Sequence, residues 1–345
     1  MNVLGVLTGG GDCPGLNAAI RAIVRGSVAR GYDVVGILHG WQGLAEGKTL
    51  PLDRRAVAGI LPRGGTILGT SSYDPFREEG GVAAILEESR TLGLDGVVAI
   101  GGEGTLGVAH RLHAERGYPV VGVPKTIDND LAGTDVTIGF DTAVHVCTEA
   151  LDRLHTTAES HNRVMVVEVM GRNTGWIAAA AGIAGGADVI LVPEVPTTIE
   201  EVCDRVRDRH DEGKDFSIVV VAEGYRLTRR SGEQEGPVVQ EVDEYGYARL
   251  GGIGRVVADE IERLTGFETR VTVLGHVQRG GTPTARDRFL ATRLGLKAAE
   301  LAAAGAWGRM AAVRGNEISD CSLEEATLAR RSVPPGWIEA SRVVA

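Results

Sequence analysis

The hydrophobic positions of this chain form short continuous runs that alternate with segments of helix length. Val3–Leu7, Asp95–Ile100 and Pro119–Pro124 are rich in apolar and β-branched residues and lack the alternation of a half-exposed strand. Such runs are typical of parallel strands that are covered on both faces. Helical patterns with apolar residues three and four positions apart follow the first two runs. The pattern predicts an α/β fold.

The same rhythm continues to the end of the chain. Further strands are expected at 32–38, 163–170, 189–192, 217–222, 268–274 and 310–314, and helices near 16–24, 82–86, 106–112, 143–160, 198–212, 254–264, 283–304 and after 323. Residues 225–250 interrupt the rhythm because they are polar and carry no helical stripe. We expect an excursion or a small hairpin there rather than a domain.

Glycine-rich segments follow several of these expected strands. The chain has 49 glycines in 345 residues, about twice the usual share of roughly 7%. They gather in Thr8–Asn17, Arg63–Ser72 and Gly101–Thr105. Glycine lets backbone N–H groups approach phosphate oxygens, and a following helix start adds its positive dipole end. A tight turn without a ligand is the alternative for any one of these segments.

The segment Lys125–Asp130 carries the polar groups that a reaction needs. It follows the strand after Gly101–Thr105, and consecutive parallel strands deliver their loops to one edge of a sheet, where ligands of open α/β folds bind. Lys125 supplies a charge, Thr126 a hydroxyl, and Asp128 or Asp130 a carboxylate that can take a proton from an attacking alcohol. Glu103 is a candidate ligand of a divalent cation. A solvated turn remains the alternative.

Length and composition narrow the function class. A chain of 345 residues exceeds what one hydrophobic core usually serves, so we expect two domains. The net charge of −10 argues against a nucleic-acid partner. We find no signal peptide and no apolar run approaching roughly 18 residues, so we expect a cytoplasmic protein without a membrane partner. The four cysteines are far apart and show no metal-binding spacing.

Five blocks together resemble the 6-phosphofructokinase family, and within it the actinobacterial-type, ATP-dependent form of the mixed-substrate group. They are Thr8–Asn17, Gly101–Gly104, Pro124–Asp130, Val167–Arg172 and Leu274–Gly281. The resemblance implies two doubly wound, three-layer α/β domains with mainly parallel sheets. Residues 1–139 plus about 278–328 would form the phosphoryl-donor domain, and 140–277 plus about 329–345 the sugar-phosphate domain.

The resemblance also implies an activity, which is phosphoryl transfer from ATP to the 1-hydroxyl of fructose 6-phosphate with Mg²⁺. It implies a homotetramer, or at least a homodimer, with active sites shared between subunits. By position, Asp128 would be the general base, with Thr126, Arg172 and Lys125 at the transferring group and Glu103 at the metal. The donor would meet Gly11, Tyr73, Arg77, Gly102, Glu103, Gly104 and Thr105; the sugar phosphate would meet Thr126, Asp128, Met170, Gly171, Arg172, Glu223, His276 and Arg279, with Arg163 and Arg270 from a neighbouring subunit.

The chain departs from the family pattern in three places. Ser72 stands where the family usually has an arginine for the transferring phosphoryl group, so turnover is low, the acceptor differs, or Lys125 compensates. Asn173 and Thr174 replace the His-Ala of close actinobacterial relatives, which favours considering another sugar phosphate as acceptor. The effector-site arginines are matched by Arg21, Arg25 and Arg54, but His155 and Glu212 stand where cations usually complete that site, so regulation stays open.

Several other functions compete with this interpretation. A pyrophosphate-dependent enzyme normally combines Asp at position 104 with Lys at position 125; this chain has Gly104 and Lys125, which favours ATP. A lipid or NAD kinase shares the glycine loop but not the blocks around Asp128 and His276. A dehydrogenase is disfavoured because Asp12-Cys13-Pro14 interrupts the dinucleotide spacing. A non-catalytic sugar-phosphate sensor would leave Asp128 and Glu103 unexplained.

Overall fold

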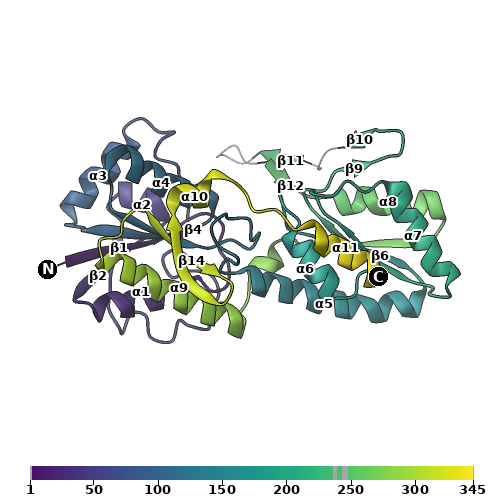
Figure 1. The fold of residues 1–345 in the computed structure, drawn as a ribbon, viewed down its shortest axis with the longest axis horizontal. Helices are drawn as coiled ribbons and strands as arrows, with labels where there is room; N and C mark the ends of the chain where they lie inside the picture. The colour runs from purple at the N-terminus through teal and green to yellow at the C-terminus, as the bar shows by residue number, and fades with distance from the viewer. Residues whose placement is uncertain (1, 236–238, 243–247, 345) are drawn as a thin grey trace. The chain divides into compact units, whose positions relative to one another are not determined.

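The fold is known from a computed structural model, which describes residues 2–235, 239–242 and 248–344 (Figure 1). The chain forms two compact units, one of Met1–Thr142 with Arg279–Arg330 and one of Ala143–Gln278 with Arg331–Ala345. They are called unit 1 and unit 2 below. The donor and sugar-phosphate roles expected for two domains stay predictions. None of the described helices has both the length and the apolar character needed to cross a bilayer.

Unit 1 is built on a seven-stranded sheet in the order β15-β14-β5-β4-β1-β2-β3. The strands are β1 (Asn2–Thr8), β2 (Tyr32–Ile37), β3 (Thr49–Leu52), β4 (Gly96–Gly101), β5 (Val120–Pro124), β14 (Arg309–Arg314) and β15 (Glu317–Ser322). The inner strands are parallel, and the edge strands β3 and β15 are antiparallel to their neighbours. Burial on both faces explains the continuous apolar runs of β1, β4 and β5.

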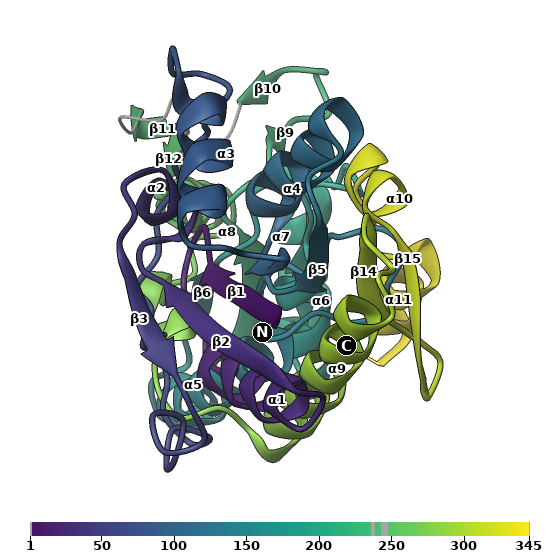
Figure 2. The ribbon, with the colours of Figure 1, turned by 90° about the vertical axis from the view of Figure 1, so that its left-hand side faces the viewer.

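Helices cover both faces of this sheet (Figures 1 and 2). They are α1 (Leu16–Val28), α2 (Gly40–Ala45), α3 (Gly81–Thr91), α4 (Glu103–Arg116), α9 (Ala285–Ala303) and α10 (Leu323–Leu328). Helices α1 and α9 pack together on one face, whereas α2, α3, α4 and α10 lie on the other, where Trp41, Ile85 and Leu106 join one core. Unit 1 is therefore a three-layer α/β structure, as the family resemblance implies.

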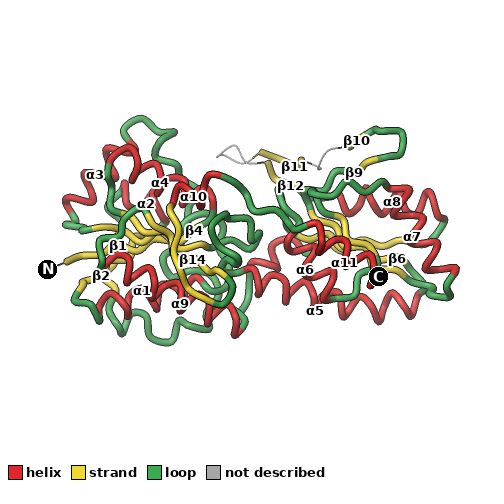
Figure 3. Tube along the Cα trace, in the orientation of Figure 1, coloured by secondary structure: helices red, strands yellow, loops and turns green. Residues whose placement is uncertain are grey.

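Unit 2 contains a four-stranded, fully parallel sheet in the order β13-β6-β8-β7. Figure 3 shows strands and helices of this unit by colour. Its strands are β6 (Val164–Val169), β7 (Val189–Leu191), β8 (Ser217–Ala222) and β13 (Thr269–Val273). Its helices are α5 (Phe140–His161), α6 (Trp176–Ala184), α7 (Ile199–Asp211), α8 (Ile253–Thr265), the 3₁₀ helix η1 (Gly275–Arg279) and α11 (Pro335–Val344). The first turn of α5 belongs to unit 1. One face packs on α7 and α8 through a shared core, and α6 contacts the sheet at β7 and β8. The predicted strand–helix rhythm is confirmed.

The excursion after β8 consists of two small hairpins. Strands β9 (Leu227–Thr228) and β10 (Gln234–Glu235) pair with each other, as do β11 (Val239–Val242) and β12 (Ala248–Leu250). The prediction of a small hairpin rather than a domain is confirmed for the described part of the excursion. Residues 236–238 and 243–247 lie outside the described residues.

Candidate active site

Three glycine-rich or polar loops meet at the carboxyl edge of the unit 1 sheet. Strand β1 pairs with β2 on one side and with β4 on the other, so the strand order reverses between β1 and β4. The Gly9 N–H donates to the Ile100 carbonyl at 3.0 Å, and the Lys125 N–H donates to the Gly101 carbonyl at 3.0 Å. Ligands of open α/β sheets bind at such a reversal point.

Thr105 determines how closely helix α4 approaches the strand ends. A Cβ atom at Gly9 would lie 2.5 Å from the Thr105 Oγ1, and one at Gly101 would lie 2.3 Å from the Thr105 Cβ, so both positions require glycine. The Thr105 side chain is consequently buried. Glu103 and Gly104 are exposed in the first helical turn, where N–H groups lack intrahelical partners and favour a phosphate.

The loop Lys125–Asp130 is fixed by hydrogen bonds rather than left as a solvated turn. Asn129 adopts a left-handed conformation with φ of 52° and accepts from the Thr137 N–H through its Oδ1 at 3.0 Å. The Thr137 hydroxyl donates to the Thr126 carbonyl at 2.6 Å, and the Asp128 N–H donates to the Thr126 Oγ1 at 3.1 Å. The loop therefore presents Asp128, half-buried, from a fixed backbone.

Asp130 is held in its neutral form over an unusual pH range. Burial, with smaller contributions from the negative charges of Asp128 and Glu103, raises the pKa of Asp130 to about 7, and the positive charge of Arg330 opposes the shift. The folded protein therefore keeps a proton that the unfolded chain releases near pH 4. The Asp130 contribution to stability is complete below about pH 4 and is lost as the pH rises through about 7.

Asp130→Asn is expected to stabilise the metal-free protein at pH 8 and not at pH 4. The amide mimics the protonated acid, and a shift of about three pKa units corresponds to at most roughly 4 kcal/mol. Urea unfolding of native and variant proteins at both pH values, with a chelator present, measures the difference. A difference of equal size at pH 4 and pH 8 would contradict a titrating origin.

Lys125 is buried beneath the first glycine loop. Its ammonium donates to the Gly9 carbonyl at 2.9 Å and to the Gly11 carbonyl at 2.5 Å, and burial lowers its pKa. These are not the phosphate contacts that we expected for it from the sequence. In this structure Lys125 fixes the loop that carries Gly11, and its contact with a transferring phosphoryl group stays a prediction.

Lys125→Met is expected to lower the free energy of unfolding by roughly 1–3 kcal/mol, because the buried Gly9 carbonyl and the Gly11 carbonyl lose their donor. Urea denaturation measures this loss. Lys48→Met is the matched control, since the Lys48 side chain is 57% exposed in its pair with Glu46 and should contribute little. Equal losses in the free energy of unfolding for the two substitutions would show that Lys125 does not anchor the glycine loop.

Glu103, the candidate metal ligand, is paired with Arg330. The guanidinium Nε donates to the Glu103 Oε2 at 3.0 Å and Nη2 donates to Oε1 at 3.1 Å, which is a two-pronged ion pair. The Arg330 backbone forms an antiparallel bridge with Leu131, the residue after Asp130. Sequence reasoning missed Arg330, which lies 227 positions from Glu103 and outside every glycine-rich segment.

The remaining expected donor residues are spread around the same edge. Gly11 is exposed, and the Arg279 guanidinium lies against it, 2.6 Å from where a Cβ would be, while donating to the Asp12 carbonyl at 3.3 Å. Burial and, to a smaller extent, a hydrogen bond with Glu78 raise the pKa of Tyr73 to about 12. Arg77 pairs with Asp74 at 3.4 Å. Their contacts with a donor stay predictions.

In unit 2, the expected sugar-phosphate residues follow neighbouring strands at the carboxyl edge. Met170–Arg172 follow β6, Glu223 follows β8 and His276 lies in η1 after β13. The Gly224 N–H donates to the Gly171 carbonyl at 3.0 Å, which joins the first two loops. Buried Gln278 joins the third, because its Oε1 accepts from the Met170 N–H at 3.2 Å and its Nε2 donates to the Gly275 carbonyl at 3.0 Å. Gln278 is a further residue that sequence reasoning missed.

Arg163 and Arg270 lie at the opposite edge of this sheet. Arg163 precedes β6, and Arg270 stands near the start of β13, opposite Met165. Six strand residues separate Arg163 from Met170, a distance of roughly 20 Å. Glu268 pairs with Arg163 at 2.8 Å and also with Arg270, and the first of these pairings chiefly lowers the pKa of Glu268. Within one chain, these arginines do not join the loops around Met170.

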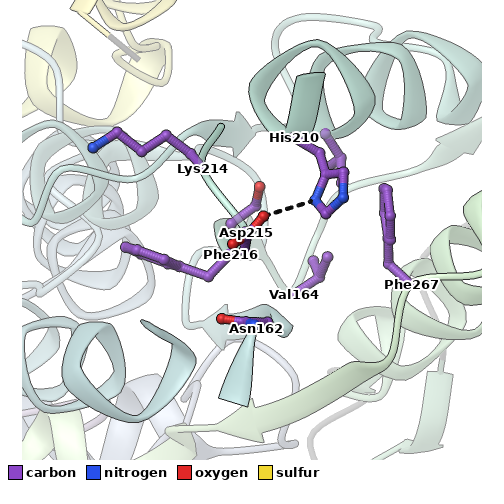
Figure 4. A pocket seen from close by; sticks show the side chains of 9 residues that line it. Asn162, Val164, His210, Lys214, Asp215, Phe216 and Phe267 are labelled. Atoms are coloured by element: carbon purple, nitrogen blue, oxygen red, sulfur yellow. Dashed lines mark ion pairs between the residues drawn. The ribbon is translucent and has the colours of Figure 1, made fainter. Parts of the chain in front are cut away.

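A small, open hollow also lies at the amino edge of the unit 2 sheet (Figure 4). His210 faces Asp215 across it at 3.8 Å, with Phe267 beside the imidazole at a ring-centroid distance of 4.6 Å. None of the residues expected at the reaction site lines it. The candidate site therefore rests on the loops at the carboxyl edges and not on this hollow.

The comparison with known proteins decides the family. A family model described as phosphofructokinase matches residues 3–302. The chain belongs to the phosphofructokinase family. A relative from Streptomyces coelicolor named pyrophosphate–fructose 6-phosphate 1-phosphotransferase is 54% identical over 97% of each chain, and another from the same organism, named ATP-dependent 6-phosphofructokinase 3, is 53% identical over 96% of each.

The structures agree with this membership. The phosphofructokinase of Saccharomyces cerevisiae superposes with a TM-score of 0.82 at 33% identity, covering 95% of this chain and 45% of that one. The match extends over both units. The expected α/β fold with mainly parallel sheets is thereby confirmed for this phosphofructokinase.

The residues present fit a magnesium ion that is shared with a phosphate donor. Among the described residues, no group of three or more His, Cys, Asp or Glu side chains is arranged to hold a metal by itself. Mg²⁺ typically takes one or two carboxylates and completes its shell with waters and substrate phosphates. Glu103, exposed at a helix start beside Asp128 and Asp130, matches that requirement.

Proposed function

We propose that this phosphofructokinase transfers the terminal phosphoryl group of ATP to the 1-hydroxyl of fructose 6-phosphate. The observation that carries the proposal is the meeting of the Gly101–Thr105 and Lys125–Asp130 loops on adjacent parallel strands, joined by the hydrogen bond from Lys125 to Gly101. One loop offers exposed helix-start N–H groups, and the other presents a carboxylate from a fixed backbone.

In the proposed reaction, Asp128 accepts the proton of the acceptor hydroxyl while that oxygen forms a bond to the transferring phosphorus. The bond from phosphorus to the bridging oxygen of ATP breaks, and ADP leaves with the electron pair. Glu103 and the donor phosphates would hold magnesium, which neutralises charge on the phosphates when bound. Met170, Gly171, Arg172, Glu223, His276 and Arg279 would bind the sugar phosphate.

The donor is the point on which relatives differ. Relatives named for pyrophosphate and for ATP are almost equally similar to this chain, at 54% and 53% identity. We favour ATP because Gly104, in the first turn of α4, has no side chain. It therefore adds neither volume nor negative charge beside the donor. The pyrophosphate-dependent activity is the second candidate, and the names of several relatives favour it.

We also propose that the active protein is a homotetramer, or at least a homodimer. The position of Arg163 and Arg270 supports this, because in one chain they lie at the amino edge, roughly 20 Å along the strand from Met170. A neighbouring subunit would bring them to the sugar phosphate. Light scattering of the purified protein measures the oligomer size.

A coupled assay with purified protein tests the proposed function. ATP and pyrophosphate are each offered with fructose 6-phosphate and with other sugar phosphates, in the presence of Mg²⁺. We expect the highest kcat/KM for ATP with fructose 6-phosphate. Higher kcat/KM with another acceptor would shift the assignment to a different sugar-phosphate kinase, as Ser72, Asn173 and Thr174 allow. Absence of transfer with every pair would favour the sensor.

A further inference from the structure

The cations around the carboxyl edge of the unit 1 sheet are distributed in an unexpected way. Position 72 is an exposed serine, so it brings no charge to the transferring phosphoryl group. The Lys125 ammonium is buried and donates to two loop carbonyls. Phosphoryl transfer nevertheless depends on positive groups that stabilise charge on the moving phosphate. Besides Arg172, which is expected at the transferring group, another cation at this edge would strengthen that stabilisation.

Arg330 has the position for that role. Its bridge to Leu131 places its backbone beside the end of the Lys125–Asp130 loop, and its guanidinium binds both oxygens of Glu103. Its positive charge opposes the rise in the pKa of Asp130, to which the negative charges of Asp128 and Glu103 contribute. Arg330 therefore lies among the groups assigned to the metal and the base.

The ion pair between Arg330 and Glu103 is suited to exchange. Both side chains are 48% exposed, and exposed ion pairs are weak because water competes for each charge. A guanidinium fork matches two oxygens of a phosphoryl group as well as it matches a carboxylate. Glu103 can thus bind a metal while Arg330 binds the phosphoryl group, and breaking the ion pair costs little free energy.

We propose that Arg330 is a catalytic residue that binds the transferring phosphoryl group and supplies the charge that Ser72 lacks. In the donor-free protein, Arg330 neutralises Glu103 and competes with a divalent cation for its carboxylate. The inference rests on the proposed function, and it adds no bond-making step of its own. Arg330 acts on the phosphoryl group while Asp128 takes the proton.

The test compares Arg330→Met, which keeps an unbranched apolar stem and removes the charge, with Arg330→Lys, which keeps the charge and removes the fork. Arg314→Met is the matched control, because Arg314 forms a similar exposed pair with Glu325 at 2.8 Å in the same unit. Mn²⁺ binding to the donor-free protein is followed by electron paramagnetic resonance. Turnover is measured with saturating ATP and fructose 6-phosphate, with and without added guanidinium ions.

Arg330→Met is expected to bind Mn²⁺ about threefold or more tightly and to lose at least about 10²-fold in kcat, with partial rescue by guanidinium ions. Arg330→Lys should be intermediate, and Arg314→Met should match the native protein. An active native enzyme whose Arg330→Met variant keeps kcat within threefold, binds Mn²⁺ more weakly or shows no rescue would overturn the inference alone. A native protein that transfers no phosphoryl group to any sugar phosphate would overturn the proposed function instead.

Discussion

Asp128→Asn is expected to lower kcat by at least about 10²-fold while donor and acceptor still bind. The amide keeps the size of the side chain and removes its affinity for a proton. The Asp128 N–H, the Asn129 side chain and Thr137 hold the loop, and the substitution leaves these hydrogen bonds in place. The loss should therefore reflect chemistry rather than collapse of the loop.

The measurement is kcat and both KM values in steady state, with thermal unfolding as a check on the fold. Asp33→Asn is the control, since Asp33 is exposed on β2 and its replacement removes a carboxylate from the same unit. An unchanged kcat in Asp128→Asn would refute the assignment of the base. The variant should also titrate Asp130 at lower pH, because the Asp128 charge contributes to raising that pKa.

The strands that carry the site could be predicted from the sequence because each is buried on both faces. β4 and β5 are fully buried, so every position is apolar or glycine and the signal is continuous. The polar residues after them stand out by contrast. This is why Gly101–Thr105 and Lys125–Asp130 could be located, and why their meeting at one edge followed from the parallel order.

Elements with a weak or ambiguous pattern were not predicted. Helix α6 is Trp-Ile-Ala-Ala-Ala-Ala-Gly-Ile-Ala, mostly buried, and its near-uniform apolar composition gives no helical stripe. Strand β3 contains Pro51, which usually argues against a strand but is tolerated here because β3 is at the sheet edge. Strand β15, with polar Asp320 and Ser319, is the other edge.

Side-chain partners far apart in the chain were the least predictable part of the site. The phosphate contact expected for Lys125 stays a prediction, and sequence reasoning did not reveal that its ammonium donates to the carbonyls of Gly9 and Gly11, more than a hundred positions away. Arg330 has no motif around it and is identified only by its contact with Glu103. Sequence patterns report burial and backbone type, whereas such pairs depend on how loops from different strands fold against each other.

Gly104→Asp is expected to lower kcat/KM for ATP by about 10²-fold and to leave the acceptor KM nearly unchanged. A carboxylate there would repel the negative α-phosphate of a nucleotide and occupy its volume. The fold should tolerate the change, because Gly104 is exposed in the first turn of α4, where an acidic side chain interacts favourably with the helix dipole. Pyrophosphate has no α-phosphate to exclude, so its use should rise relative to ATP.

Gly107→Asp separates a local clash from a general effect of charge. Gly107 lies one turn further along the same helix, and a Cβ there meets nothing within 4 Å, so the same charge is added without entering the proposed donor position. The two donors are compared by kcat/KM at saturating fructose 6-phosphate and magnesium, in the native protein and both variants. The preference for ATP should survive in Gly107→Asp and fall in Gly104→Asp. If the native protein prefers pyrophosphate, or if Gly104→Asp keeps full activity with ATP, position 104 does not select the donor and the alternative activity replaces the one proposed.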